Sequence, residues 1–128
     1  MTGRRWLGRL RGPERDRGAF TAELAAGLPA LMLLLLTGLS MVSAVAAHIR
    51  CVDAAREGAL TASRGGPGVS HAAAIAPADA TIDLVQGKDT VTVTVHAPVP
   101  LLGGNLPAIT VRAAAVAARE PEALESVP

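Results

Sequence analysis

An uninterrupted apolar segment near the amino terminus constrains the fold of this chain more than any other feature. Residues 24–47 form a run of 24 residues without one ionisable side chain. As an α-helix, at about 1.5 Å per residue, such a run is roughly 36 Å long. It can therefore cross a hydrocarbon core of about 30 Å with some tilt. We predict a transmembrane helix over residues 24–47.

Charge is concentrated before this segment and indicates its orientation. Residues 1–18 contain six arginines and two acidic residues, a net charge of +4, whereas the remaining 110 residues sum to −3. Because basic residues are retained on the cytoplasmic side, the amino terminus is predicted to be cytoplasmic and the carboxy-terminal part extracytoplasmic. We expect a single-pass protein of the inner (cytoplasmic) membrane.

The helical pattern continues beyond the membrane segment. Apolar residues recur with a helical period until a cluster of glycine and proline at residues 65–68 ends the helix. We predict one long helix over residues 21–63 that is amphipathic in its distal half. The side chains expected to form its apolar stripe are Ile49, Val52, Ala55, Ala59 and Ala62.

Strict alternation of threonine and valine over residues 90–95 predicts a β-strand with one solvated face. Residues 81–84 alternate in the same way, and residues 109–112 resume the pattern after a loop rich in glycine and proline. We therefore predict an α+β fold, in which a long N-terminal helix is followed by a small three-stranded antiparallel sheet packed on the apolar stripe. The predicted parts are a basic leader (1–18), the helical segment (19–64), a Gly/Pro-rich linker (65–79), a small β domain (80–118) and a disordered acidic tail (119–128).

The side chains that usually carry chemistry are few and scattered. Cys51 is the single cysteine, and we favour a buried packing role for it over pairing with another chain. His48, His71 and His96 lack the spacing of metal sites, and we find no P-loop, dinucleotide-binding or nucleophile-elbow motif. We therefore expect no enzyme activity, catalytic residue, cofactor, bound metal, small-molecule substrate or direct binding of nucleic acid.

The residues around the start of the apolar segment form a further pattern. A basic leader ends at Gly18, Glu23 follows five residues later at the threshold of the apolar helix, and Pro29 lies early within it. Together with the stretch 49–57 (IRCVDAARE), this order of features resembles the type IV pilin superfamily. More narrowly, residues 15–65 resemble the TadE-like minor pilins or pseudopilins of tight-adherence (Flp/Tad) pilus systems, of the actinobacterial type.

The resemblance implies a role for each of these residues. A prepilin peptidase is expected to cut between Gly18 and Ala19, where glycine leaves the backbone accessible. Glu23 is then expected to pair with the freed amino terminus of a neighbouring subunit, which offsets the cost of a carboxylate near hydrocarbon. Pro29 is expected to kink the helix. Leu24 stands where Flp-type major pilins have a tyrosine, so a minor subunit is expected.

The partners that the resemblance implies are the membrane, the prepilin peptidase, other pilin subunits and the inner-membrane assembly platform. The resemblance is compatible with a pilus for adhesion, secretion or DNA uptake, and with a subunit at the tip of the fibre or in its shaft. Two other functions stay open. A signal-peptidase site after the small residues 44–46 would give a secreted small protein that starts at Ala47. An uncleaved chain would be a single-pass membrane-anchored scaffold.

Overall fold

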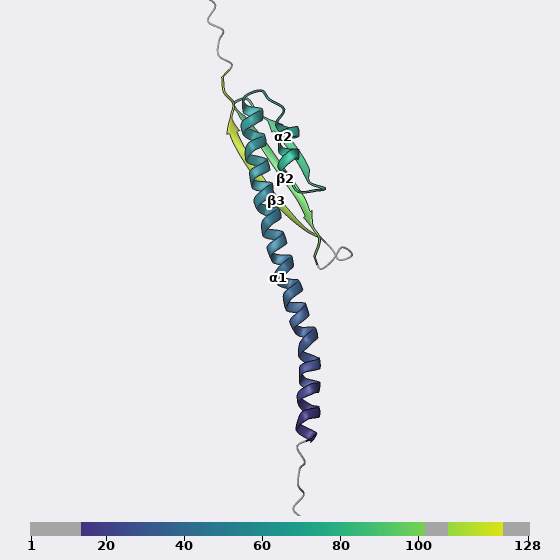
Figure 1. The fold of residues 1–128 in the computed structure, drawn as a ribbon. Helices are drawn as coiled ribbons and strands as arrows, with labels where there is room; N and C mark the ends of the chain where they lie inside the picture. Colours follow the sequence, from purple (N-terminus) through teal and green to yellow (C-terminus); the bar gives the residue numbers. More distant parts are fainter. Residues whose placement is uncertain (1–13, 102–107, 122–128) are drawn as a thin grey trace, which may run out of the picture. The chain divides into compact units, whose positions relative to one another are not determined.

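The computed structural model describes residues 14–101 and 108–121 (Figure 1). The chain divides into two compact units, Met1–Leu36 and Thr37–Pro128, called here the inner and the outer unit. The elements in chain order are helix α1 (Glu14–Ser63), helix α2 (Gly68–Ile75) and strands β1 (Thr81–Gln86), β2 (Thr90–Val99) and β3 (Ile109–Ala118). This order confirms the predicted α+β fold of a long N-terminal helix followed by a three-stranded antiparallel sheet.

Helix α1 begins earlier than the sequence predicted. Its first residue is Glu14, so the expected starts at residues 19 and 21 are corrected, and the helix includes the last residues of the predicted leader. Between Pro13 and Pro29 no proline removes a backbone donor, so nothing in the backbone prevents the helix from extending into the leader. The rest of the leader, residues 1–13, lies outside the described residues.

The other end of α1 lies at the predicted position. Gly65 adopts a φ of +78°, which glycine tolerates without steric cost. Its N–H donates to the carbonyl of Ala62 (3.0 Å), and the N–H of Gly66 donates to the carbonyl of Thr61 (2.9 Å). This pair of hydrogen bonds is a Schellman motif, which satisfies carbonyls left over at a helix end.

The sheet is a meander whose strand order, β1-β2-β3, follows the chain. In the central strand, Val93 lies opposite Leu84 of β1 and Ala115 of β3. Val91, Val93 and Val95 are fully buried, and the threonines that alternate with them are half-buried. The predicted alternation is therefore confirmed, with the valine face directed into the core.

Small side chains of α1 form the other half of this core in the outer unit. They recur at helical spacing and share one cluster with the buried valines of β2. Small residues let the helix backbone approach the sheet closely, so that side chains of both elements are excluded from solvent. The residues of this small-residue stripe are Cys51, Ala54, Ala55, Ala59 and Ala62.

The predicted apolar stripe is therefore partly wrong. Ala55, Ala59 and Ala62 are buried as predicted, but Ile49 and Val52 are 54% and 42% exposed. The prediction chose the stripe by helical spacing alone, whereas the face that the sheet covers is rotated toward Cys51 and Ala54 and consists of small side chains. The two larger side chains consequently lie on the outward side of the helix.

The prediction of a linker over residues 65–79 is corrected, because the segment contains α2. This helix packs beside α1 at two glycines. A Cβ placed on Gly58 would lie 2.9 Å from the Cβ of Ala72 and 3.1 Å from the carbonyl oxygen of Gly68. The sequence analysis predicted a linker because glycines and prolines flank this segment. Between them lies a short run of good helix formers, alanines 72–74.

The residues that follow β3 are tied to the rest of the outer unit. The N–H of Arg119 donates to the carbonyl of Asp89 (2.8 Å), and the N–H of Glu120 donates to the carbonyl of Ser63 (3.2 Å). Arg64 and Glu120 also form an ion pair at 3.5 Å. The first residues of the predicted disordered tail are thus held in place, which corrects the prediction at Arg119 and Glu120. Residues 122–128 lie outside the described part, and for them it stays a prediction.

Candidate functional site

The residues of the predicted processing site lie on α1 in the inner unit. Gly18 and Ala19 are helical and exposed, and nothing lies within 4 Å of the position that a Cβ of Gly18 would take. The Thr21 hydroxyl donates to the carbonyl of Arg17 (2.9 Å), within the same turn. A peptidase that grips an extended backbone would therefore have to unwind this turn, and nothing described in the inner unit covers it.

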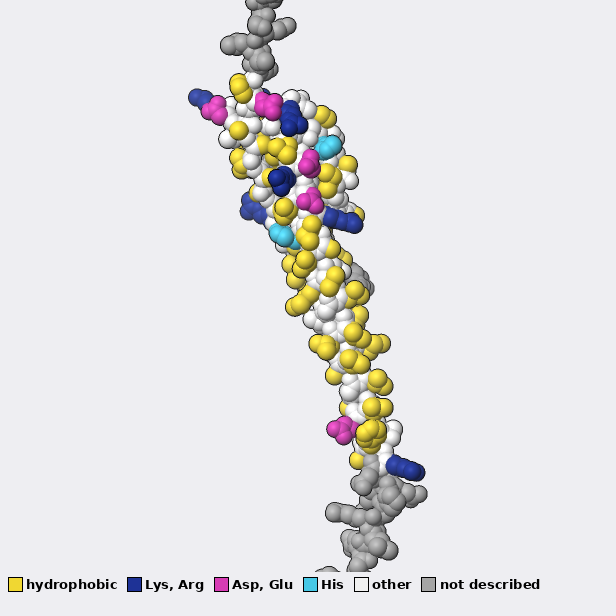
Figure 2. Space-filling model, turned by 60° about the vertical axis from the view of Figure 1, so that its left-hand side comes forward, with side chains coloured by type: hydrophobic (Ala, Val, Ile, Leu, Met, Phe, Trp, Pro, Cys, Tyr) yellow, Lys and Arg dark blue, Asp and Glu magenta, His cyan; other side chains and the backbone are white. Residues whose placement is uncertain are grey.

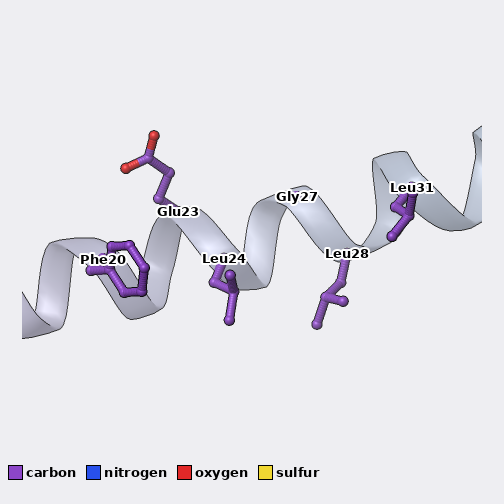
Figure 3. Close-up of a pocket in the computed structure, with 6 residues that line it drawn as sticks. All are labelled: Phe20, Glu23, Leu24, Gly27, Leu28 and Leu31. Atoms are coloured by element: carbon purple, nitrogen blue, oxygen red, sulfur yellow. The ribbon is translucent and has the colours of Figure 1, made fainter.

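Glu23 stands beside an apolar hollow on the same helix (Figure 3). The hollow has a volume of about 360 Å³. Gly27, four residues after the glutamate, leaves the gap because it has no side chain. In this view the carboxyl group of Glu23 points away from the helix, on the side opposite to Leu24 and Leu28. The lining residues are Phe20, Glu23, Leu24, Gly27, Leu28 and Leu31.

This geometry suits packing against another helix. A side chain of a neighbouring helix can insert where a glycine leaves a gap between larger residues, and small residues at such contacts let helix backbones approach. The carboxyl group of Glu23, at the rim of the hollow, would then contact the group that the neighbouring helix presents there. Sequence analysis singled out Glu23 but missed Gly27 and the hollow, although a glycine one helical turn after the glutamate was the available signal.

The apolar surface of α1 is large and uncovered by this chain. The helix is long and apolar enough to cross a membrane, and none of its most apolar window is buried within the structure. Figure 2 shows hydrophobic side chains covering this part of the helix. Contiguous apolar surface of this size requires lipid or protein cover. The structure therefore agrees with the predicted membrane segment, residues 24–47, in length and exposure.

The outer unit also exposes an apolar face of α1. Ile49, Val52 and Leu60 point away from the small-residue stripe and are 54%, 42% and 38% exposed. Just before them, a shallow groove of about 410 Å³ is lined by Met41, Val42, Val45, Ala46 and Ile49. We call this set, from Met41 to Leu60, the outward apolar face of α1. It is available for a second helix outside this chain.

The remaining predicted site residues do not gather into a second centre. Cys51 is fully buried, as the packing interpretation predicted, and burial raises the pKa of its thiol. His48 and His71 are exposed, while His96 lies 3.8 Å from Asp83 on the solvated face of the sheet. Among the described residues no group of histidine, cysteine, aspartate and glutamate side chains could hold a metal ion.

Pro29 lies inside α1, and the helix continues through it. Its predicted kink stays a prediction. The structure thus places Gly18, Ala19, Glu23 and Pro29 along one helix, although the sequence predicted Gly18 to lie in the leader before the helix, and it adds Gly27 to the candidate site.

One relative connects the chain to a known protein. The apoptosis inhibitor Rv3655c of Mycobacterium tuberculosis (strain ATCC 25618 / H37Rv) is 36% identical over 101 residues, which cover 77% of this chain and 78% of the relative. The chain belongs to the family of this protein. No protein-family model and no solved structure matches the chain.

Proposed function

We propose that the chain is a minor pilin or pseudopilin of a TadE-like type IV (tight-adherence, Flp) pilus assembly system and acts by helix bundling. One observation carries the proposal. Glu23 lies at the rim of an apolar hollow, five residues after an unobstructed glycine, at the start of a helix long enough to cross a membrane.

In this proposal the inner unit supplies the assembly contact. Cleavage after Gly18 by a prepilin peptidase frees the amino group of Ala19. The freed amine of one subunit approaches Glu23 of the next and offsets the free energy that a lone carboxylate near hydrocarbon costs. The hollow at Gly27 receives a side chain of the neighbouring helix, so that charge and shape together set the stagger between two helices.

The membrane and the outward apolar face complete the proposed arrangement. The arginines of the leader keep the amino terminus in the cytoplasm, and the outer unit lies on the extracytoplasmic side. The outward apolar face of α1 packs against other pilin helices on the inner-membrane platform or in the fibre. The proposed action is assembly, with no catalytic residue.

The test is the mass of the mature protein from cells that contain a prepilin peptidase. The proposal expects the loss of residues 1–18 and a new amino terminus at Ala19. Gly18→Leu should leave the precursor intact, whereas the matched control Gly12→Leu, in the same leader, should not. A mature chain that starts at Ala47 would identify a secreted protein, and an uncut wild-type chain would identify a membrane-anchored scaffold; either result rejects the proposal.

The family member supplies a second candidate function, because its name describes an apoptosis inhibitor and it shares 36% identity with this chain. In that case the protein would lower the fraction of cells that undergo apoptosis when they are exposed to it, which a count of apoptotic cells would measure. One variant distinguishes the two candidate functions, because Gly18→Leu should abolish pilus assembly and leave an inhibition of apoptosis unchanged.

A further inference from the structure

In the outer unit, strands β2 and β3 extend side by side along α1 (Figure 1). The N–H of Glu120, just after β3, donates to the carbonyl of Ser63 at the end of α1, so the two strands run from this end back along the helix. Val93 of β2 lies beside Gly58, because its Cγ1 would be 3.4 Å from a Cβ added there. Six further strand residues, to Val99, cover about 20 Å, which is the length of about 13 helical residues. The strands therefore end beside the part of α1 close to residue 45.

The burial of α1 agrees with this position. Ala44 and Ala47 are half-buried and lie on the same side of the helix as Cys51, whereas residues 18–39 are all exposed. A membrane crossing that starts at Leu24 needs about 20 helical residues for a hydrocarbon core of about 30 Å, and it ends near residue 43. The headgroup layer adds about 5–7 Å on each side. In such a crossing, the end of the strand pair lies in the headgroup layer.

This end of the outer unit carries no ionisable side chain among its described residues. The residues concerned are 40–47 of α1, 97–101 at the end of β2 and 108–111 at the start of β3. Ile109 is nevertheless 49% exposed there. Burial of a charge in an apolar medium costs much free energy, whereas this surface has no charge to bury. We call it the uncharged end of the outer unit.

Basic side chains begin just beyond the uncharged end, on the helix and on the sheet alike. On α1 they are His48 and Arg50, and on the sheet they are the cross-strand pair of His96 and Arg112. His96 lies three strand residues from Val93, about 10 Å, which places it beside the part of α1 close to residue 51. These four side chains, called here the basic belt, thus share one position along α1 although they belong to different faces. A planar surface such as a membrane contacts a molecule in this way.

The acidic side chains nearest to the basic belt lie further from the uncharged end. Asp53 follows Arg50 on α1, and Asp83 lies opposite Thr94, two residues before His96. Both arginines of the belt are exposed, and neither forms an ion pair with an acidic side chain of the described residues. Their charge is therefore available to the anionic phosphate groups of lipids, which attract basic side chains close to a membrane.

We propose that the outer unit rests directly on the membrane surface, with its uncharged end in the headgroup layer and the guanidinium groups of Arg50 and Arg112 bound to phosphates of anionic lipids. No stalk then separates the sheet from the bilayer. The proposal rests on the membrane crossing in the proposed function, and on neither cleavage nor pilus assembly.

Fluorescence quenching in the full chain, held in lipid nanodiscs, tests this position of the sheet. In a Cys51→Ala background, Ile109→Cys carries a fluorophore, and the quencher is a phosphatidylcholine with a nitroxide on its headgroup. The matched control is Val116→Cys, which lies on the same strand, is 65% exposed and stands seven residues further from the uncharged end. Quenching at residue 109 should be at least about threefold stronger than at residue 116, because about 23 Å of strand separates the two positions.

A third position separates failure of the proposal from failure of the membrane crossing. Leu35→Cys should be quenched by a lipid with the nitroxide on its acyl chain wherever α1 crosses the bilayer. Without that quenching, the crossing in the proposed function is wrong. Quenching at residue 35 together with equal headgroup quenching at residues 109 and 116 would overturn the contact between the sheet and the membrane.

Charge variants test the two arginines in nanodiscs that contain equal amounts of phosphatidylglycerol and phosphatidylcholine. Arg50→Gln with Arg112→Gln should lower the ratio of the two lipids retained by the protein in native mass spectrometry at least about fivefold, as expected for basic side chains at a membrane surface. The matched control, Lys88→Gln with Arg119→Gln, removes the same charge at the opposite end of the sheet and should leave the ratio unchanged. An unchanged ratio in the first pair, or an equal fall in both pairs, would overturn the assignment of Arg50 and Arg112 to lipid phosphates.

Discussion

At the scale of single residues, the room available for a side chain determines how α1 and α2 pack in the outer unit. The contact between α1 and α2 depends on the absence of a side chain at Gly58, whose three nearest neighbours would lie within 3.4 Å of an added Cβ. Two of these neighbours are a backbone oxygen and a Cβ atom, which cannot move without moving the main chain. The glycine is therefore tolerated inside a helix in spite of its poor helix propensity.

Gly58→Ala should consequently destabilise the protein. Overpacking costs about 1–3 kcal/mol, and the better helix propensity of alanine returns at most about 1 kcal/mol. We expect a net loss of about 1–2 kcal/mol in thermal or denaturant unfolding of the detergent-solubilised protein. Gly38→Ala is the control, because nothing lies within 4 Å of a Cβ there. Equal free energies of unfolding for the two variants would contradict the close packing of α1 and α2 at Gly58.

Cys51 offers a second test at this scale. Its side chain is fully buried and burial raises the pKa of the thiol, so the protonated form is favoured in the folded state. Folding therefore loses stability as the pH rises above the ordinary thiol pKa of 9.0, where the unfolded chain releases the proton first. Cys51→Ala should remove this part of the pH dependence between pH 8 and pH 10, as measured by unfolding at each pH.

At the scale of the elements, the periodicity of the sequence predicted the long helix and the strands well. It did not predict which side chains of α1 lie against the sheet. Alternation identified β2, and the glycine cluster identified the end of α1. The choice of Ile49 and Val52 for the core was wrong, because periodicity does not reveal how closely a helix lies on a sheet. Helix α2 was missed because its alanines lie between turn-forming residues. Of the candidate site, the places of Glu23 and Pro29 on one helix were predictable, but the helical conformation of Gly18 and the hollow at Gly27 required coordinates.

A matched pair of valines in the sheet tests its orientation. Val93 of β2 is fully buried, whereas Val116 of β3 is 65% exposed. Both changes to alanine remove the same atoms from a strand. A difference between their losses of unfolding free energy therefore reflects the difference in burial of the two side chains. Val93→Ala should lower the free energy of unfolding by about 1.5–3 kcal/mol, and Val116→Ala by less than about 0.5 kcal/mol. Comparable losses would mean that the sheet packs by its other face.

At the scale of the whole molecule, the chain has an outer unit with its own core and a long apolar helix without cover. The outer unit can bury valines and alanines by itself, but the outward apolar face of α1 has no partner within the described chain. In the proposed function, that face contacts other pilin helices. Its replacement should therefore impair assembly and spare folding.

Val52→Asp examines this division of roles. It places a charge on the outward apolar face, so we expect copurification with other pilin subunits to fall at least about tenfold, as for an unpaired charge buried at an interface. Unfolding of the outer unit should change by less than about 0.5 kcal/mol, because the side chain faces away from the core. The control is Val85→Asp, at a 65% exposed position on β1, which should leave copurification intact. Equal behaviour of the two variants would exclude the face as a contact.

The meander order of the sheet bears on biogenesis. Each strand pairs with its neighbour in the chain, across connections of three residues between β1 and β2 and nine residues between β2 and β3. Short connections cost little loop entropy and favour rapid folding. The sheet can therefore form strand after strand in the order of the chain, without a contact from any distant segment.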